Sequence, residues 1–244
     1  MSTLPGTTGR RRIYLMRHGF VDYSSKEVLA TRDPSIARLT PQGEEEALAA
    51  GAALQDIHFD VAICSGLRRT KQTAKLVLSK HRNPPKLEED LRLEEIKSGK
   101  YIDFESAEQL AATMTLQYER AGEPEATFLD GGEKFIDTMS RVANALLSLI
   151  ARENWHTALV VAHEGINRLI LTWAIGASLS ACAAFEQDTG CINIIDFDLV
   201  PEVDGRGVKI ERALIKAVNL TPANYLKNGM NLRSLEAIFT KNKP

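Results

Sequence analysis

The sequence has few cysteines, and their spacing is not that of metal ligands. Cys64, Cys182 and Cys191 are the only three in 244 residues, which argues against a disulfide framework and against a zinc site. Asp196 and Asp198 do not suggest a metal either, because they alternate along a predicted strand and no ligand framework joins them. We therefore expect a reducing, cytoplasmic setting, with no cofactor and no catalytic metal.

An excess of charge of one sign is also lacking. The chain has 30 basic and 32 acidic residues and a formal net charge of -2, so it has no global field that would hold a nucleic acid. We interpret the arginines at positions 10–12 as the solvated end of a flexible tail that covers residues 1–11. We therefore expect no nucleic-acid partner, and any anion must be bound locally.

Long apolar runs, internal repeats and proline-rich linkers are absent as well. The apolar run at residues 13–16 is too short for a signal-peptide core or a membrane span. The nine prolines are dispersed along the chain, which favours one continuous unit. We expect no membrane contact and a single domain over residues 12–244.

Short apolar runs alternate with helical patterns over most of the chain. Such alternation is typical of a mostly parallel sheet that is covered by helices on both faces. The sequence therefore predicts an α/β fold, a three-layer α/β/α sandwich. The strand-like runs cover residues 13–16, 61–64, 158–162, 191–197 and 208–214.

One helical pattern has no accompanying strand. Apolar residues recur at helical spacing from Ala107 to Tyr118, between the strand-like runs at 61–64 and 158–162. We interpret the region around residues 97–130 as a small helical insertion that lies over the sheet as a lid.

Basic side chains follow three of the predicted strands. Arg17 and His18 end the first strand, Arg69 lies just inside the helix after the second, and His163 follows the third. The carboxyl ends of parallel strands form the ligand-binding edge of such sheets, so these groups should meet there. Gly19 would let the backbone approach a ligand closely. Converging cations repel one another unless an anion lies among them, which predicts an oxyanion pocket with phosphate as its occupant.

Histidine chemistry follows from such a pocket. A neutral imidazole is a competent nucleophile, so His18 could attack phosphorus while the other basic groups neutralise the oxygens without a metal. The leaving alcohol then needs a proton. Glu94 and Glu95 are both candidates for this general acid, and the residues alone do not choose between them.

Five segments of the sequence form an ordered set of motifs. They resemble, in this order, the signatures of the histidine phosphatase superfamily, also called the phosphoglycerate mutase-like family, and cover roughly residues 12–200. The segments are Arg17-His18-Gly19, Leu39-Thr40-Pro41-Gln42-Gly43, Ser65-Gly66-Leu67-Arg68-Arg69-Thr70-Lys71-Gln72-Thr73-Ala74, Gly131-Gly132-Glu133 and Val160-Val161-Ala162-His163-Glu164-Gly165.

The resemblance implies roles for single residues. His18 would be the residue that is phosphorylated, and the acid falls on Glu95, because Gly99 stands four residues after it. Glu94 is then a bystander. The substrate contacts implied in this way are Arg17, Ser24, Arg69, His163 and Gly165.

Departures from the family pattern favour its phosphatase branch. Many members follow the Arg-His-Gly triplet with Glu or Gln and then Thr or Ser, whereas this chain has Phe20 and Val21. These two residues would either form an apolar wall for the leaving group or pack against the sheet. Ser24 stands where an asparagine is common among mutases.

We therefore predict a metal-independent phosphatase that hydrolyses small phosphate monoesters through a phosphohistidine. A phosphoglycerate-type mutase and a catalytically silent phosphate-binding module remain as alternatives. The presence of a nucleophile and an acid argues against the silent module, since binding alone requires neither. The sequence leaves the oligomeric state open, including a homodimer.

Overall fold

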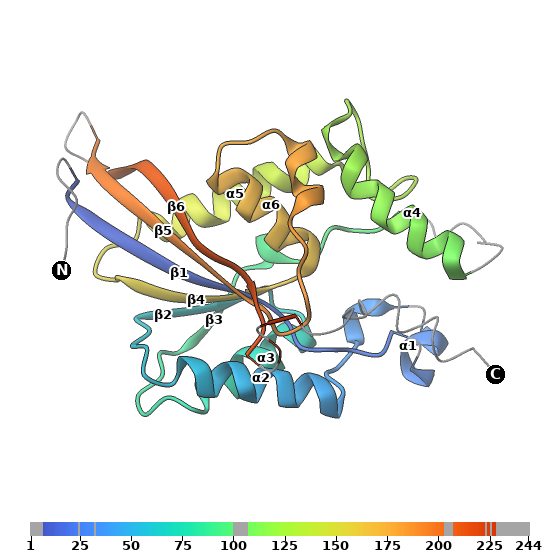
Figure 1. Cartoon of the computed structure of the whole chain (residues 1–244), viewed down its shortest axis with the longest axis horizontal. Helices are drawn as coiled ribbons and strands as arrows, with labels where there is room; N and C mark the ends of the chain where they lie inside the picture. The colour runs from blue at the N-terminus through green and yellow to red at the C-terminus, as the bar shows by residue number, and fades with distance from the viewer. Residues whose placement is uncertain are drawn as a thin grey trace.

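The sheet of the computed structural model is mostly parallel, as predicted, and helices cover both of its faces (Figure 1). The structure describes residues 7–23, 25–31, 33–99, 107–202, 207–222, 224, 226 and 227. The strand order is β3-β2-β4-β1-β5-β6. Strands β1 to β4 are parallel to one another, and β5 runs antiparallel to both of its neighbours, β1 and β6. The strands are β1 Gly9–Arg17, β2 Val61–Cys64, β3 Leu87–Glu89, β4 Thr157–Ala162, β5 Ile192–Pro201 and β6 Val208–Leu220.

Two pairs of helices make the outer layers of the sandwich. Alternate side chains of β1 point to opposite faces of the sheet. Tyr14 and Met16 therefore pack with one pair, and Ile13 and Leu15 with the other. The first pair is α2 Pro41–Leu54 and α3 Arg68–Leu78, and the second is α5 Phe135–Ile150 and α6 Glu164–Ala174. The predicted three-layer fold is thus confirmed, while the short strand β3 was missed.

The remaining helices are short or belong to the insertion. The helix expected between Ala107 and Tyr118 is present as α4, Ala107–Glu119, and projects beyond the sheet (Figure 1). The ring centroid of Tyr118 lies 5.6 Å from that of Phe128, which fastens the end of α4 to the core. A lid function for this insertion stays a prediction. The others are α1 Lys26–Thr31 and the 3-10 turns Pro34–Ile36, Leu91–Leu93, Arg120–Gly122 and Leu179–Ala184.

The predicted tail over residues 1–11 was too long, because residues 9–11 belong to a strand. Strand β1 begins at Gly9, and its register places Arg10 opposite Asp198 and Arg12 opposite Asp196. Both carboxylates are fully buried, and Arg10 Nε lies 2.7 Å from Asp198 Oδ1. Burying a carboxylate without a partner costs free energy, so pairing with these arginines stabilises the two aspartates in the sheet. The sequence contains arginines at alternate positions 10 and 12 and aspartates at alternate positions 196 and 198. Their pairing could not be read from the sequence, because the two segments are far apart in the chain.

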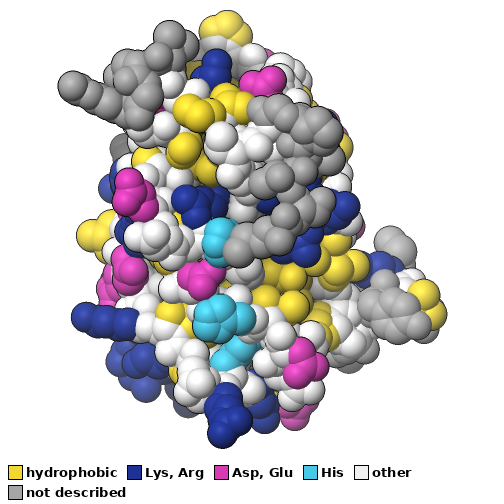
Figure 2. Space-filling model, turned by 90° about the vertical axis from the view of Figure 1, so that its left-hand side faces the viewer, with side chains coloured by type: hydrophobic (Ala, Val, Ile, Leu, Met, Phe, Trp, Pro, Cys, Tyr) yellow, Lys and Arg dark blue, Asp and Glu magenta, His cyan; other side chains and the backbone are white. Residues whose placement is uncertain are grey.

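The left-hand end of the molecule in Figure 1 carries the amino-terminal end of β1. Figure 2 shows this end, where both acidic and basic side chains lie on the surface. Among the residues that the structure describes, no helix combines the length and apolar character needed to cross a lipid bilayer.

Candidate active site

The four predicted basic groups meet at the carboxyl edge of the sheet. Arg17 ends β1 and His18 follows it, Arg69 lies in the first turn of α3, and His163 is the N-cap of α6. Because β1, β4 and β2 are parallel neighbours, their ends lie side by side. The four side chains are only 0–4% exposed. The ring centroids of His18 and His163 are 5.2 Å apart.

Hydrogen bonds determine which nitrogen of His18 carries the proton. Nδ1 lies 2.8 Å from the carbonyl oxygen of Gly19, which only accepts, so Nδ1 donates and Nε2 holds a bare lone pair. Arg69 Nε donates to this Nε2 over 3.2 Å. Burial, followed by the charges of Arg69 and Arg17, lowers the pKa of His18 well below its ordinary value. The imidazole is therefore neutral near pH 7, and its nucleophilic nitrogen faces a guanidinium.

The loop after His18 is clamped against α2. A Cβ on Gly19 would lie 2.2 Å from the carbonyl oxygen of Gly43, so no side chain fits there. The backbone of Gly19 thus lies close to this helix, and its close approach to a ligand stays a prediction. Gly190 N donates to His18 O over 3.1 Å from the other side, and Thr73 Oγ1 accepts from Gly19 N. These contacts hold the backbone of His18 and Gly19 in place.

Arg17 is held by a carboxylate that the sequence did not single out. Glu164 Oε2 lies 3.0 Å from Arg17 Nη2, and Glu164 Oε1 lies 2.9 Å from Arg168 Nη2. Gln187 O also accepts from Arg17 Nη1 over 2.6 Å. Buried Arg168 stacks in turn on the ring of Tyr118 at 4.5 Å. Arg17 is therefore connected, through Glu164 and Arg168, to the end of the insertion helix α4. The only sequence signal for Glu164 was its place beside His163.

Glu95 follows the 3-10 turn Leu91–Leu93, and its carboxyl group contacts the amino-terminal end of α6. Gly165 N donates to Glu95 Oε2 over 3.3 Å, and Ile96 N donates to Glu95 Oε1 over 3.0 Å. Burial, opposed by the bond from Ile96 and aided by the charge of Glu164, raises the pKa of Glu95 above its ordinary value. A carboxyl group that keeps its proton is what a general acid requires. Of the two candidate acids, Glu95 is thus the one whose surroundings suit the role.

The remaining predicted residues are Gly165 and Ser24, expected to contact substrate, and Phe20 and Val21, expected either to form an apolar wall or to pack. A Cβ on Gly165 would lie 2.9 Å from Glu95 Oε1, so this glycine makes room for the acid; its substrate contact stays a prediction. Ser24 lies outside the described residues. Val21 is 1% exposed and packs in a small apolar cluster with Leu39 and Ala47, whereas Phe20 is partly exposed. Val21 is therefore a packing residue.

No metal site is evident in the described part of the chain. Nowhere among these residues do three or more His, Cys, Asp or Glu side chains gather in a way that could hold an ion. The aspartates 196 and 198 instead accept from the arginines of β1 and from Arg212 of β6.

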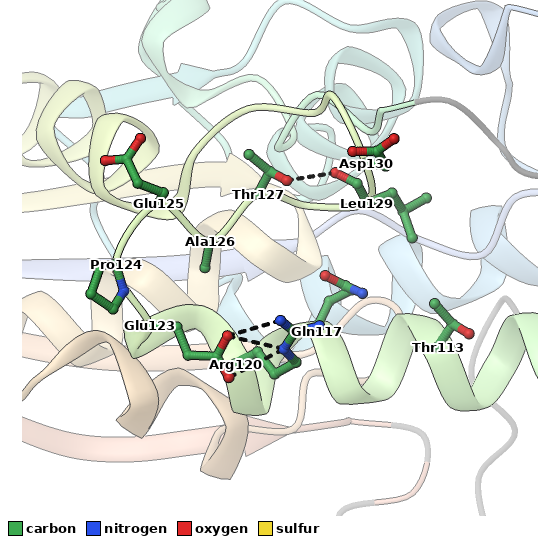
Figure 3. Close-up of a pocket in the computed structure, with 10 residues that line it drawn as sticks. All are labelled: Thr113, Gln117, Arg120, Glu123, Pro124, Glu125, Ala126, Thr127, Leu129 and Asp130. Carbon is green, nitrogen blue, oxygen red and sulfur yellow. Dashed lines mark hydrogen bonds and ion pairs between the residues drawn. The ribbon is translucent and has the colours of Figure 1, made fainter.

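A separate cavity of about 370 Å³ lies on the insertion (Figure 3). It is bounded by Thr113 and Gln117 from α4, by Arg120 from the following 3-10 turn, and by residues of the loop 123–130. Arg120 is paired with Glu123 across 2.9 Å, and Figure 3 shows the two side chains directed toward each other. None of the converging active-site residues lines this cavity.

The chain is similar in sequence to proteins with phosphatase names. It is 28% identical over 211 residues to Adenosylcobalamin/alpha-ribazole phosphatase of Escherichia coli strain K12, with 83% of this chain and 100% of that protein covered. It is 26% identical over 220 residues to Probable 2-carboxy-D-arabinitol-1-phosphatase of Arabidopsis thaliana. That match covers 90% of this chain but only 44% of the longer plant protein.

The fold and the family agree with this similarity. The crystal structure of the alpha-ribazole phosphatase from Shigella flexneri superposes with a TM-score of 0.61 and 24% identity, covering 85% of this chain and 96% of that one. At this identity, the likeness shows the shared fold. The sequence model of the histidine phosphatase superfamily (branch 1) matches residues 13–200. The chain therefore belongs to the histidine phosphatase superfamily, branch 1.

Proposed function

We propose that the chain hydrolyses small phosphate monoesters through a phosphohistidine on Nε2 of His18. One observation carries the proposal: the unprotonated Nε2 of a neutral His18 accepts a bond of 3.2 Å from Arg69 Nε, in a buried site that also contains Arg17. A buried cluster of this kind is stabilised when an anion enters it. An unprotonated imidazole nitrogen beside such an anion is a competent nucleophile.

The first half-reaction transfers the phosphoryl group to the enzyme. Nε2 of His18 forms a bond to phosphorus while the bond from phosphorus to the ester oxygen breaks. Arg17 and Arg69 offset the charge on the equatorial oxygens. Glu95 gives its proton to the departing oxygen, which leaves as an alcohol.

The second half-reaction restores the enzyme. Glu95, now a carboxylate, takes a proton from a water molecule as the water oxygen attacks phosphorus. The bond from phosphorus to Nε2 of His18 breaks, inorganic phosphate leaves, and Glu95 is again protonated. Every proton and electron pair is then back in its starting place.

The substrate class is supported by the relatives and by the rim of the site. The names of the two relatives refer to phosphorylated metabolites, a carboxylated sugar alcohol in one case and alpha-ribazole or adenosylcobalamin in the other. Partly exposed Phe20 follows the nucleophile, and α4 connects to Arg17 through Tyr118 and Arg168. We assign specificity to the loop after His18 and to the insertion, and we favour a small or moderately apolar phosphoester.

The proposal is tested by phosphate release from an aryl phosphate in the presence of a chelator. We expect turnover by the wild type and its loss in His18→Ala, because the nucleophile is gone. His58→Ala, an exposed histidine outside the site, is the matched control and should behave like the wild type. Chelator-sensitive turnover, or turnover that survives in His18→Ala, would contradict the mechanism.

The same assay separates the two alternatives. A mutase would pass the phosphoryl group to a second acceptor, so isomerisation of phosphoglycerate would depend on a bisphosphate primer. A silent binding module would bind phosphate but release none from any ester in a panel of natural phosphate monoesters. Hydrolysis without a primer is the expected result.

A further inference from the structure

The hydrogen bonds around His163 can be followed proton by proton. Thr70 Oγ1 lies 2.8 Å from the carbonyl oxygen of Leu67, which only accepts, so the single hydroxyl proton of Thr70 goes there. Ser65 Oγ lies 2.9 Å from Thr70 Oγ1 and must therefore donate that bond. Since its proton is then used, Ser65 Oγ accepts the 2.8 Å bond from His163 Nε2. This chain places the proton of the neutral imidazole on Nε2.

The other ring nitrogen of His163 is then a bare lone pair. Nδ1 is buried and has no hydrogen-bond partner among the described residues, and the whole side chain is 0% exposed. A bare nitrogen repels a phosphate oxygen, whereas a protonated one donates to it. His163 therefore cannot donate to a bound phosphoryl group in the protonation state that its neighbours impose.

The surroundings explain why His163 is neutral in the absence of an anion. Burial, followed by the charges of Arg69, His18, Arg17 and Arg141, lowers its pKa well below the ordinary value. The nearby carboxyl groups are Glu164, next in the chain, and Glu95, which accepts from the following residue. A phosphate dianion beside Nδ1 would reverse the balance, because it adds negative charge where cations now dominate. The charged and titratable groups around His163 are His18 and Arg17 at the end of β1, Arg69 on α3, Arg141 on α5, Glu164 next to it in the chain, and Glu95, which accepts from Gly165 N.

We propose that His163 takes up one proton at Nδ1 when the phosphoester binds, and that Ser65 and Thr70 are the positioning residues that make this uptake necessary. The inference rests on the proposed function of the site. The proton comes from solvent, or from the phosphate itself when a monoanion binds. The resulting imidazolium keeps its bond from Nε2 to Ser65 and donates from Nδ1 to a phosphate oxygen. When phosphate leaves, the proton leaves as well.

This arrangement gives the site a third cation only while an anion is bound. Arg17 and Arg69 are both buried, and a permanent imidazolium beside them would add repulsion to the folded enzyme. Proton uptake on binding supplies the positive charge when negative charge is present to offset it. Substrate affinity should consequently fall as the pH rises, because the proton becomes scarcer.

Calorimetry with tungstate measures the uptake directly. Tungstate imitates phosphate but carries no proton of its own at pH 8, so any proton taken up reaches the protein from the buffer. Binding heats in buffers of different ionisation enthalpy give the number of protons per tungstate. We expect about one for the wild type. Uptake near zero in the wild type would overturn the inference, and absence of tungstate binding would overturn the proposed pocket along with it.

Thr70→Val separates His163 from other proton acceptors such as Glu95. The isosteric valine cannot accept from Ser65, whose proton then goes to Nε2 of His163 and drives the imidazole proton to Nδ1. That tautomer donates to tungstate without protonation, so uptake should fall below half of the wild-type value. Thr70→Ser keeps the hydroxyl and should restore it. Thr172→Val, a buried helical threonine whose hydroxyl donates to Arg168 O over 2.8 Å, is the matched control. Full uptake in Thr70→Val would contradict the inference.

Nitrogen NMR of the unliganded wild type decides the question if Thr70→Val does not fold. The His163 signals can be assigned by their absence in His163→Gln. We expect a protonated Nε2 and a bare Nδ1 without ligand, and two protonated nitrogens with tungstate. A protonated Nδ1 in the unliganded enzyme would overturn the inference while leaving the proposed hydrolysis untouched.

Discussion

The arginine–aspartate cluster of β1, β5 and β6 and the active site both contain buried charge, and they differ in which sign is buried. In the cluster of β1, β5 and β6, the carboxylates of Asp196 and Asp198 are 0% exposed, while their arginine partners reach solvent. At the active site the reverse holds, because Arg17 and Arg69 are 4% and 3% exposed. The first cluster is complete in itself. The second consists of buried arginines beside His18, and under the proposed function an anion from outside would complete it.

The largest expected effect comes from the active-site cluster. Arg69→Met removes the guanidinium that faces His18 Nε2, and we expect kcat/KM to fall on the order of a thousandfold. The melting temperature should stay level or rise, because a buried cation is removed. Steady-state kinetics and calorimetric unfolding check both parts. A variant that loses stability along with activity would contradict the distinction between the clusters.

The matched change in the other cluster should act on stability alone. Arg12 holds Asp196 through two bonds of 2.6 and 2.8 Å. Arg12→Met leaves this buried carboxylate poorly compensated, so the free energy of unfolding should fall by about 3 kcal/mol. Urea unfolding measures the loss. Unchanged stability, or a kcat/KM far below the wild-type value, would mean that this cluster is not a structural ion-pair network.

Glu164 combines features of the two clusters, since it is a buried carboxylate that pairs with a buried arginine of the active site. Glu164→Ala removes the carboxylate that holds Arg17, and we expect kcat/KM to fall roughly a hundredfold. Glu164→Gln keeps an oxygen that can accept from Arg17 and should lose only about tenfold. Equal losses in the two variants would show that the charge of Glu164 matters more than its hold on Arg17.

The smallest expected effect concerns pH. The raised pKa of Glu95 means that it stays protonated to a higher pH than an ordinary carboxyl group, and the acid function is lost as the pH rises through that pKa. For an alkyl phosphate, kcat/KM should therefore decline on the alkaline side. For an aryl phosphate with a good leaving group the decline should be weaker, because that group needs no proton.

Glu95→Gln provides the control for this pH effect. It should remove the alkaline decline attributed to the acid and slow alkyl phosphates far more than aryl phosphates. Equal slowing of both substrate types would assign the proton transfer to another group.

Local patterns in the sequence were sufficient for the layers of the fold. Apolar runs and helical stripes predicted the central strands and the helices that cover them, and the strand-end positions of Arg17, His18, Arg69 and His163 predicted that they would meet. The structure brings these four side chains together. A strand that is followed by a basic residue is a local pattern, so this part of the site could be predicted from the sequence.

Long-range pairing accounts for most of what the sequence did not predict. The short strand β3 exists because it pairs with β2, and the arginines of β1 join the sheet because of carboxylates nearly 190 positions away. The hold of Glu164 on Arg17 and the hydroxyl chain from Thr70 to His163 likewise depend on contacts between distant segments. A single sequence carries no periodicity that marks such contacts.

The most direct measurement of the central claim is rapid chemical quench with an aryl phosphate, followed by mass spectrometry of peptides kept at alkaline pH, where phosphohistidine survives. We predict one phosphoryl group, located on His18, that forms and decays at rates compatible with turnover. Turnover without any phosphorylated peptide, or with the phosphoryl group on another side chain, would contradict the account.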